Sequence, residues 1–324
     1  MEENLTAVTD FIFLGFSDLQ HLQPLLFVLV LLIYFFTLIG NGLIIAVTVA
    51  DLALNTPMYF FLRNLSVLEI CYTSVVIPKT LTDLLSERRA ISFLGCAVQM
   101  YFYLFFGSTE CGLLTVMSYD RYVAICNPMR YSLIMSRKVT LSLAAVVWIV
   151  GKLVACEQTA AIFMFPFHGP NQINHFFCDV LSVLRLVSTD KSLINAILSF
   201  LTVVFTIVPL ILIIISYASI IWTILKMHSG EGRRKAFSTC SSHLITVILF
   251  YCSGFITYMR PSSNVSVDTN RALALLYTVI IPAFNPIIYS LRNKEVKEAL
   301  RKFLTRTVSL LHRPLLCWWK EFIH

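Results

Sequence analysis

Two pairs of ionisable residues stand within or beside long apolar runs, where a charge is costly. Glu69 and Glu110 each lie in the middle of such a run, and Asp120 and Arg121 stand side by side at the end of another. Ionisable groups at membrane depth usually mark functional sites. Two inward-facing carboxyl groups could share a proton or hold a sodium ion with waters, or each could be protonated in a purely structural role. The adjacent opposite charges could be a helix end that meets water, or a switch.

The apolar runs that carry these residues are long enough to cross a bilayer. Of the 324 residues, 57% are hydrophobic and 13% are charged, whereas a soluble domain carries about 25% charged residues. Seven runs reach the length of about 20 residues that a membrane helix needs. They lie near 25–50, 57–82, 92–122, 140–162, 195–226, 236–260 and 271–291. The predicted fold is an all-α, seven-transmembrane helix bundle, and the net charge of +7 does not by itself indicate nucleic acid binding.

The placement of lysine and arginine orients this bundle. Residues 1–10 are acidic and polar, so we expect the first span to act as its own insertion signal. With the N-terminus outside, 17 of the 25 Lys and Arg residues fall on the cytoplasmic side, as the positive-inside rule requires. We therefore expect residues 1–24 outside the cell, residues 292–324 in the cytoplasm, and glycosylation at Asn4 within Asn-Leu-Thr. The same pattern at Asn64 lies near the cytoplasmic end of a span and is interpreted as a chance match.

A long loop and two cysteines predict a lid over the outer end of the bundle. The loop 163–194 contains five phenylalanines and two prolines, a composition unlike that of a disordered segment, and loops of this length are rarely idle connections. Cys178 lies in this loop and Cys96 lies at the outer start of the third span. A disulfide between them would hold the lid in place, while the other cysteines are expected as packed or free thiols.

Prolines inside the fifth and seventh spans predict hinges. Pro209, Pro282 and Pro286 each remove a backbone hydrogen-bond donor and loosen the helix around them. Pro286 lies next to Asn285 and close to Tyr289, two polar groups that could change partners when the helix bends. Such a bundle is suited to switching, although bends also occur in static bundles.

The segment after the seventh span predicts a helix on the membrane surface. Its apolar residues recur at helical spacing between lysines and arginines, namely Val296, Leu300, Phe303 and Leu304. This pattern is typical of an amphipathic helix that contacts the anionic lipid of the inner leaflet. Cys317 in the tail could be acylated or remain an unmodified thiol.

Five motifs in the expected order resemble the signature set of vertebrate olfactory receptors, a branch of the rhodopsin-like G-protein-coupled receptors. They are MSYDRYVAICNP at 117–128, NPIIY at 285–289, LNTPMYFFLRNLS at 54–66, KAFSTCSSH at 235–243 and HFFCD at 175–179. The resemblance covers nearly the whole chain. It implies a plasma-membrane receptor of olfactory cilia that binds an odorant, needs no cofactor, and activates a stimulatory, olfactory-type G protein to raise cyclic AMP.

The resemblance also implies which residues couple the receptor to its G protein. They are Asp120, Arg121, Tyr122, Tyr217, Asn285, Pro286 and Tyr289. Arg121 would be held by Asp120 at rest and would turn towards Tyr217 and Tyr289 when the sixth helix moves outward. Tyr251, in the sequence FYCSG at 250–254, stands in place of the superfamily's toggle tryptophan and would take that role.

The odorant-contact residues that the resemblance implies are Met100, Tyr103, Leu104, Gly107 and Ser108 in the third span, Leu198, Thr202 and Phe205 in the fifth, Tyr251, Phe255 and Tyr258 in the sixth, and Thr278 in the seventh. They predict an apolar, aromatic cage with a few hydroxyls, and plain helix packing is the alternative for each. Amine receptors carry an aspartate where Tyr103 stands, so a cationic amine is not expected. We predict a small, neutral, mostly hydrophobic volatile that makes one hydrogen bond with Ser108, Tyr258 or Thr278.

The chain departs from the family pattern in the lid loop, and three other classes of protein fit the sequence less well. Family members often carry a second disulfide in the lid loop, but His168 and Ser188 occupy those positions here, which predicts a looser lid. A transporter is the main alternative to a receptor, yet the two halves show no repeat. The run 271–291 lacks the lysine that would bind retinal in an opsin or a pump. No pairing of a nucleophile with a base indicates an enzyme.

Overall fold

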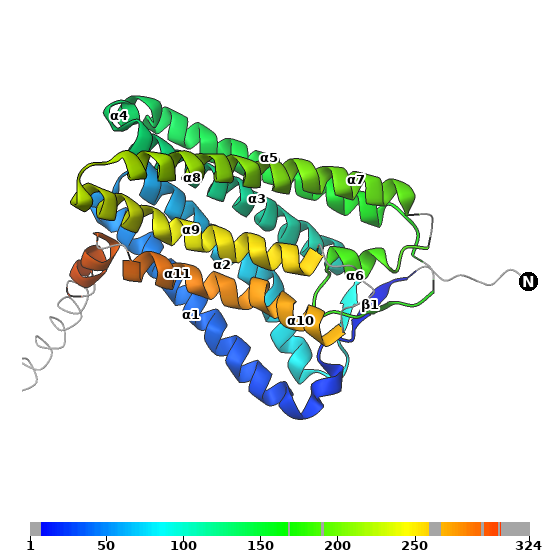
Figure 1. Cartoon of the computed structure of the whole chain (residues 1–324). Coiled ribbons are helices and arrows are strands. Elements are labelled where there is room, and N and C mark those ends of the chain that lie inside the picture. Colours follow the sequence, from blue (N-terminus) through cyan, green and yellow to red (C-terminus); the bar gives the residue numbers. More distant parts are fainter. Residues whose placement is uncertain are drawn as a thin grey trace, which may run out of the picture.

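The computed structural model describes residues 8–167, 169–188, 191–258, 267–292, 295–303 and 305. These residues form a bundle of long helices that run side by side, with a small sheet at one end (Figure 1). The uninterrupted helices are α1 (Gln23–Ala50), α2 (Pro57–Leu85), α3 (Phe93–Cys126), α5 (Arg137–Phe163) and α9 (Gly230–Tyr258). The fifth spanning helix runs through α7 (Ser192–Thr202), η4 (Val203–Ile207) and α8 (Val208–Lys226), and the seventh through α10 (Val267–Leu275), η5 (Leu276–Ile280) and α11 (Ile281–Arg292).

Six of the helical runs in the described residues are long and apolar enough to cross a membrane. They are Ser17–Ala50, Pro57–Leu85, Arg137–Phe163, Ser192–Lys226, Gly230–Thr257 and Arg271–Tyr289. The remaining long helix, α3, has 34 residues and is more polar because it carries Gln99, Glu110, Asp120 and Arg121. It contacts α2, α5, α8 and α9, so its neighbours shelter these side chains from lipid. The predicted seven-transmembrane bundle is confirmed.

The fifth and seventh spanning helices widen next to their prolines. The π-helix η4 directly precedes the turn with Pro209, and the π-helix η5 directly precedes the turn with Pro282. A proline leaves a carbonyl of the preceding turn without its amide partner, and π-helical turns are one way in which a helix accommodates this. Pro286, inside α11, lies against α1, because a Cβ added to Gly40 would come within 2.9 Å of the proline Cβ.

A three-stranded sheet closes one end of the bundle, which we call the sheet end. Its central strand is β1 (Asp10–Phe13), which pairs antiparallel with β2 (Ala90–Ser92) and parallel with β3 (Gln172–Ile173). The segment ahead of the first spanning helix is thus built into the lid, a feature that the sequence analysis did not predict. Phe11 and Phe13 of β1 are buried under this lid.

The lid loop is folded and joined to α3. A disulfide links Cys178 to Cys96, with 5.6 Å between their Cα atoms. Beside it, the backbone N–H of Cys178 donates to Oε1 of Gln99 at 3.0 Å, and Nε2 of Gln99 donates to the carbonyl of Val75 in α2 at 3.1 Å. The short helix α6 (Val180–Leu184) follows, with the Asp179 carboxylate accepting from the N–H groups of its first turn.

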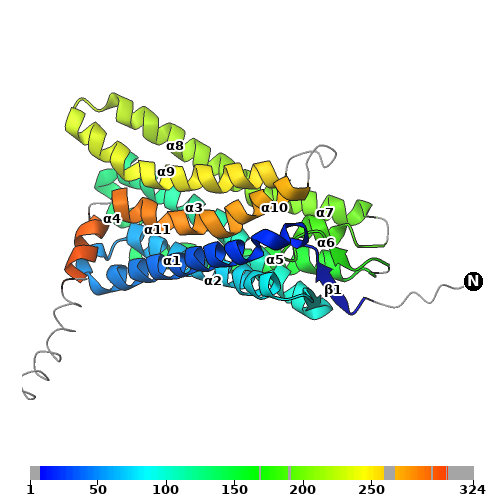
Figure 2. The same ribbon diagram turned by 90° about the horizontal axis from the view of Figure 1, so that it is seen from below.

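The opposite end of the bundle carries α4 (Tyr131–Ile134) and the end of α3, and we call it the Arg121 end (Figure 2). Residues 295–303 form a helix here, which we call the tail helix. Val296 and Ala299 are buried against the core, with Leu300 and Phe303 packed beside them. The hydroxyl of Tyr59 in α2 donates to a carboxylate oxygen of Glu295 at 2.6 Å. Leu304 and Cys317 lie outside the described residues.

Candidate functional site

A cavity of about 510 Å³ lies in the half of the bundle nearest the sheet end. Its walls come from α2, α3, α5, the lid helix α6, the α7–η4 run, α9, η5 and the start of α11. The volume falls within the range of small-molecule sites, which are typically apolar with a few polar groups. Tyr103 and Leu104 of α3, together with Tyr251 and Phe255 of α9, are among its mainly apolar lining residues. The chamber is therefore suited to a small organic ligand.

Eight of the twelve residues predicted to contact an odorant line this cavity. They are Tyr103, Leu104, Gly107, Ser108, Leu198, Thr202, Tyr251 and Phe255. They reach the cavity because α3, α7 and α9 each turn one helical face inward, which helical spacing arranges.

The other four predicted contacts are placed differently. Met100 is fully buried with Cys96 and Ile162 in a separate apolar cluster under the lid. Thr278 is fully buried in η5, and its hydroxyl donates to the carbonyl of Ala274 at 2.6 Å. Phe205 lies in η4 but is not among the cavity-lining residues. The side chain of Tyr258 lies outside the described part of the chain. Of the three predicted hydrogen-bonding residues, Ser108 alone lines the cavity within the described side chains.

The cavity has polar lining residues that the sequence analysis missed. Gln158 of α5 and Asn195, Ser199 and Thr206 of the α7–η4 run all line it. A sequence signal existed, since positions 195, 199, 202 and 206 recur at the spacing of one helical face. Gln158 carried no comparable signal, because a single polar residue near a helix end does not indicate which way it faces.

The two intramembrane glutamates lie at the centre of the bundle. Glu69 accepts a hydrogen bond from the side-chain N–H of Asn285, which joins α2 to α11. Glu110 is buried in α3, interacts electrostatically with Glu69, and lines the cavity. The second carboxyl oxygen of Glu69 and Oδ1 of Asn285 have no hydrogen-bond partner among the described residues. Orphaned oxygens beside a second carboxyl group fit the predicted sodium or water network, which stays a prediction.

The adjacent charges at the Arg121 end are both buried. The Asp120 carboxylate accepts a hydrogen bond from the hydroxyl of Tyr131 in α4 at 2.8 Å. The ion pairs within 4.0 Å in the described residues are Lys79–Asp83 and Arg271–Asp18. Asp120 is therefore hydrogen-bonded to α4, while its interaction with Arg121 is electrostatic and longer than 4.0 Å; its hold on Arg121 at rest, which the resemblance implies, stays a prediction.

Tyrosines on two other helices surround Arg121. The guanidinium interacts electrostatically with Tyr217 of α8 and Tyr289 of α11. The Tyr217 hydroxyl pairs with Nδ1 of His243 in α9 at 2.6 Å. The Tyr289 hydroxyl interacts with the Thr246 side chain of α9, and Tyr122 packs against the apolar cluster that contains Tyr217. The structure thus brings the predicted tyrosines to Arg121, with α9 as an additional partner.

A buried arginine joins three segments at the sheet end. The guanidinium of Arg271 in α10 donates to Asp18 at 2.9 Å and to Oδ1 of Asn174 in the lid at 2.6 Å. Asp18 belongs to the helical turn η1 (Ser17–Leu22) that follows β1, and its hydrogen bond with Arg271 lowers the pKa of the carboxyl group. Burial of His175, with the charge of Arg271 nearby, lowers the pKa of the imidazole to about 4, so the side chain is neutral.

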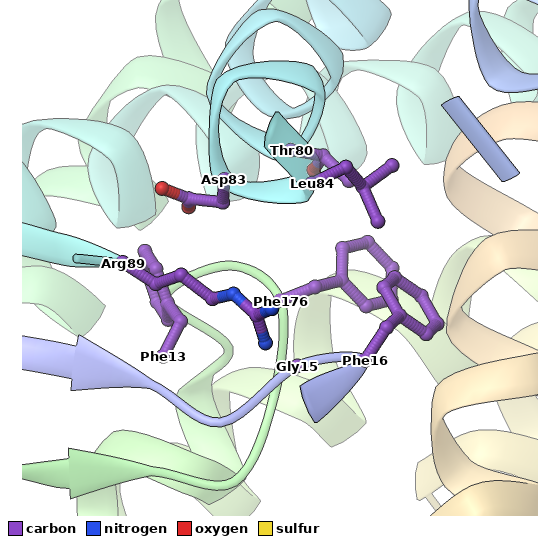
Figure 3. Close-up of a pocket in the computed structure, with 8 residues that line it drawn as sticks. All are labelled: Phe13, Gly15, Phe16, Thr80, Asp83, Leu84, Arg89 and Phe176. Carbon is purple, nitrogen blue, oxygen red and sulfur yellow. The ribbon is translucent and has the colours of Figure 1, made fainter. Parts of the chain in front are cut away.

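A second cavity at the sheet end is too small for an odorant. It lies where the segment after β1 passes the end of α2, and its volume is about 10 Å³, roughly the space of one water molecule. Figure 3 shows Arg89 and Asp83 on one side of it and Phe16 and Phe176 on the other. The larger cavity is therefore the candidate ligand site.

The predicted glycosylation site at Asn4 lies outside the described residues, as does His168 of the second-disulfide pair. Asn64 is occupied within the bundle, because its side chain donates to the carbonyl of Phe60 at 2.9 Å and accepts from Nε1 of Trp148 at 3.1 Å. This position is consistent with a chance match to the glycosylation pattern.

Comparisons with known proteins all find similarity to one family. A family model described as "Olfactory receptor" matches residues 30–307. The human protein named "Olfactory receptor 10A7" is 53% identical over 306 residues, which covers 94% of this chain and 97% of that protein. Two further human proteins, "Olfactory receptor 10A5" and "Olfactory receptor 10K1", are 51% and 50% identical, with 95% and 94% of this chain and 97% of each relative covered.

Proposed function

Since this chain belongs to the olfactory receptor family, we propose that it binds a small, neutral, mostly hydrophobic volatile in the 510 Å³ cavity and thereby activates a stimulatory, olfactory-type G protein. Members of the family are receptors and not enzymes, and the apolar helices make the chain a multi-pass membrane protein. The product of the proposed signalling is cyclic AMP, and the proposed location is the plasma membrane of olfactory cilia.

In this proposal the sheet end faces outward and the Arg121 end faces the cytoplasm. The Cys96–Cys178 disulfide lies at the sheet end, and disulfides persist on the oxidising side of the membrane. The free cysteines Cys126 and Cys240 lie towards the other end, together with most of the lysines and arginines. The basic face of the tail helix would then contact anionic lipid of the inner leaflet.

The observation that carries the ligand proposal is the cavity itself. Most of its surface is apolar, with aromatic and aliphatic side chains from α3, α6, α7 and α9, and Ser108 adds a hydroxyl group. Among the described lining residues, the one ionisable carboxyl group is that of Glu110, and no lysine or arginine lines the cavity. A charged acid would therefore lack a counter-ion, which favours a neutral ligand.

Helix α9 links the cavity to the Arg121 end. Tyr251 lines the cavity, and His243, eight positions earlier on the same helix, pairs with Tyr217. Eight residues of α-helix span about 12 Å, so a displacement of α9 that accommodates a ligand also moves the His243–Tyr217 contact beside Arg121. Outward movement of α9 would open the groove for the G protein.

The test is a panel of volatiles applied to cells that express this receptor with the olfactory G protein, with cyclic AMP as the readout and a flux assay beside it. Phe255→Ala removes a ring from the cavity wall and should raise the half-maximal concentration of an identified agonist about tenfold or more. Ile248→Ala is the matched control, because Ile248 lies on the same helix, is half exposed and does not line the cavity. Identical curves for Phe255→Ala and the parent, or flux without cyclic AMP, would contradict the proposal.

A further inference from the structure

One wall of the large cavity is polar, and it comes from two neighbouring helices. Asn195, Ser199, Thr202 and Thr206 line the cavity from successive turns of the α7–η4 run. Gln158 lines it from α5, which packs beside α7 at the sheet end (Figure 1). The cavity therefore has a polar wall, made by these five residues, and an aromatic wall on α3 and α9.

The polar wall has hydrogen-bonding capacity that the protein does not use. The Thr202 hydroxyl donates to the carbonyl of Leu198 at 2.8 Å, so its hydrogen is engaged within the helix. Within the described residues, no side-chain hydrogen bond engages the amide groups of Gln158 and Asn195. Each of these amides offers two N–H donors and one carbonyl acceptor. Both residues line the cavity that a ligand would occupy.

From this arrangement we infer that the ligand is an oxygenated volatile whose carbonyl oxygen accepts hydrogen bonds from Gln158 and Asn195, while its hydrocarbon body packs against Tyr103 and Phe255. This inference rests on the proposed function and narrows the ligand class. It moves the polar contact from Ser108, on α3, to the wall formed by α5 and α7.

A carbonyl group matches the polar wall better than other common groups. Its oxygen has two lone pairs and can accept from both amides at once. An alkane would remove the amides from water without replacing their hydrogen bonds, and such unpaired groups cost affinity. A carboxylate would meet no lysine or arginine among the described lining residues. An alcohol can also bind the polar wall. Its hydroxyl must place its own hydrogen as well as accept hydrogen bonds, so fewer orientations satisfy both amides.

The experiment uses sets of volatiles that share one hydrocarbon skeleton and differ only in their functional group: ketone, aldehyde, ester, alcohol, amine, carboxylic acid and alkane. Several linear and cyclic skeletons are tested on the full-length receptor in the cyclic AMP assay. We expect the carbonyl members of a responding skeleton to be the most potent, and the alkane and the acid to be the weakest.

Two near-isosteric variants then assign the contact. Gln158→Met and Asn195→Leu keep the side-chain volume and remove the amide, so each should raise the half-maximal concentration for the carbonyl agonist about three- to tenfold. The same variants should leave the response to the matching alkane unchanged or improved. Gln158→Asn, which keeps an amide, should restore part of the selectivity. Ser216→Ala is the control, because the Ser216 hydroxyl donates to the carbonyl of Leu212 within α8 and the residue lies outside the cavity lining.

The outcomes separate this inference from the proposed function. A receptor that responds to the panel but ranks the amine or the alkane above the carbonyl member would overturn the inference and leave the receptor function standing. The same holds if the two variants shift every member of a set by an equal factor, because loss of fold or expression would do that. A surface-displayed receptor that answers no volatile at all would contradict the proposed function and this inference together.

Discussion

The two ends of the bundle are closed by different kinds of interaction. At the sheet end, β1 is paired on both sides, a disulfide fixes the lid to α3, and Arg271 joins η1, the lid and α10. At the Arg121 end, α3, α8 and α9 pack through an apolar cluster, and the polar contacts between helices include single side-chain hydrogen bonds such as Asp120–Tyr131 and Tyr217–His243.

This difference makes the sheet end, with its cavity, the fixed end of the molecule and the Arg121 end the movable end. Backbone pairing and a covalent bond must be broken together to open the lid, whereas a single side-chain hydrogen bond contributes only about 1 kcal/mol. A ligand shifts an equilibrium between two conformations by its difference in affinity for them, which is typically a few kcal/mol. Binding in the cavity can therefore rearrange the Arg121 end without unfolding the sheet end.

The largest expected effect comes from removing the central cation of the movable end. Arg121→Ala should abolish agonist-stimulated cyclic AMP with surface expression retained, because Tyr217 and Tyr289 lose the charge that acts on both of them. Arg130→Ala is the matched control, since Arg130 is an exposed cation at the same end. Full signalling by Arg121→Ala would show that Arg121 is only a helix end reaching water.

Removing the disulfide tests the fixed end. The double variant Cys96→Ala and Cys178→Ala opens a loop with a sequence separation of 82, which in the chain-entropy model is worth about 4.5 kcal/mol of unfolding free energy. We expect a large fall in surface expression and in the melting temperature of the solubilised receptor. Cys156→Ala, at an exposed free cysteine, provides the control. An unchanged melting temperature would mean that the sheet alone holds the lid.

Arg271→Met should weaken the same end less than loss of the disulfide. The variant removes a buried charge-assisted hydrogen bond to Asn174 and one to Asp18, and we expect a loss of about 1–3 kcal/mol. Asp18→Asn should cost much less, because the Asp18 side chain is 68% exposed and exposed ion pairs contribute little. Equal losses in the two variants, measured as melting temperatures, would contradict this division.

The lid should also weaken in acid. The pKa of His175 is lowered to about 4 by burial, whereas an unfolded histidine titrates near 6.5. Between these values the unfolded lid binds more protons, so stability falls as the pH drops below 6.5, by about 1.4 kcal/mol per pH unit. Asp179, which favours protonation, and Arg271, which opposes it, are the nearby charges. Melting curves of His175→Asn should show less dependence between pH 6.5 and 5 than the parent.

The sequence predicts the long helices of both ends, but it does not predict the sheet of the fixed end. The spanning helices follow from run length and hydropathy, which are local properties, and α3 was predicted in spite of its polar residues. The strand β1 could not be predicted, because residues 10–13 pair with segments about 80 and 160 positions further along the chain. A short strand of this kind has no periodic signal of its own.

Within the candidate site, the sequence predicts which residues share a helical face but not what that face contacts. The aromatic wall was predicted from the family resemblance, which places Tyr103 and Phe255 at the cavity. The polar wall shows helical spacing in the sequence, but that spacing does not say whether its face meets ligand or lipid. Asp120 was paired with its neighbour Arg121, and the competing hydrogen bond from Tyr131 depends on how α4 folds back onto α3.

The smallest expected effect concerns that hydrogen bond. Tyr131→Phe removes one hydrogen-bond donor to the buried Asp120 carboxylate at the movable end. The carboxylate then lacks its hydrogen bond to α4. A loss of about 1 kcal/mol from the resting arrangement corresponds to a roughly fivefold rise in the active population. Cyclic AMP measured without odorant should therefore increase several-fold at equal surface expression. Tyr119→Phe changes an exposed tyrosine two positions from Arg121 and should leave the basal level unchanged. A fall in basal signalling with Tyr131→Phe would instead place the Tyr131–Asp120 bond in the active arrangement, and the movable end would then gain this contact when the cavity fills.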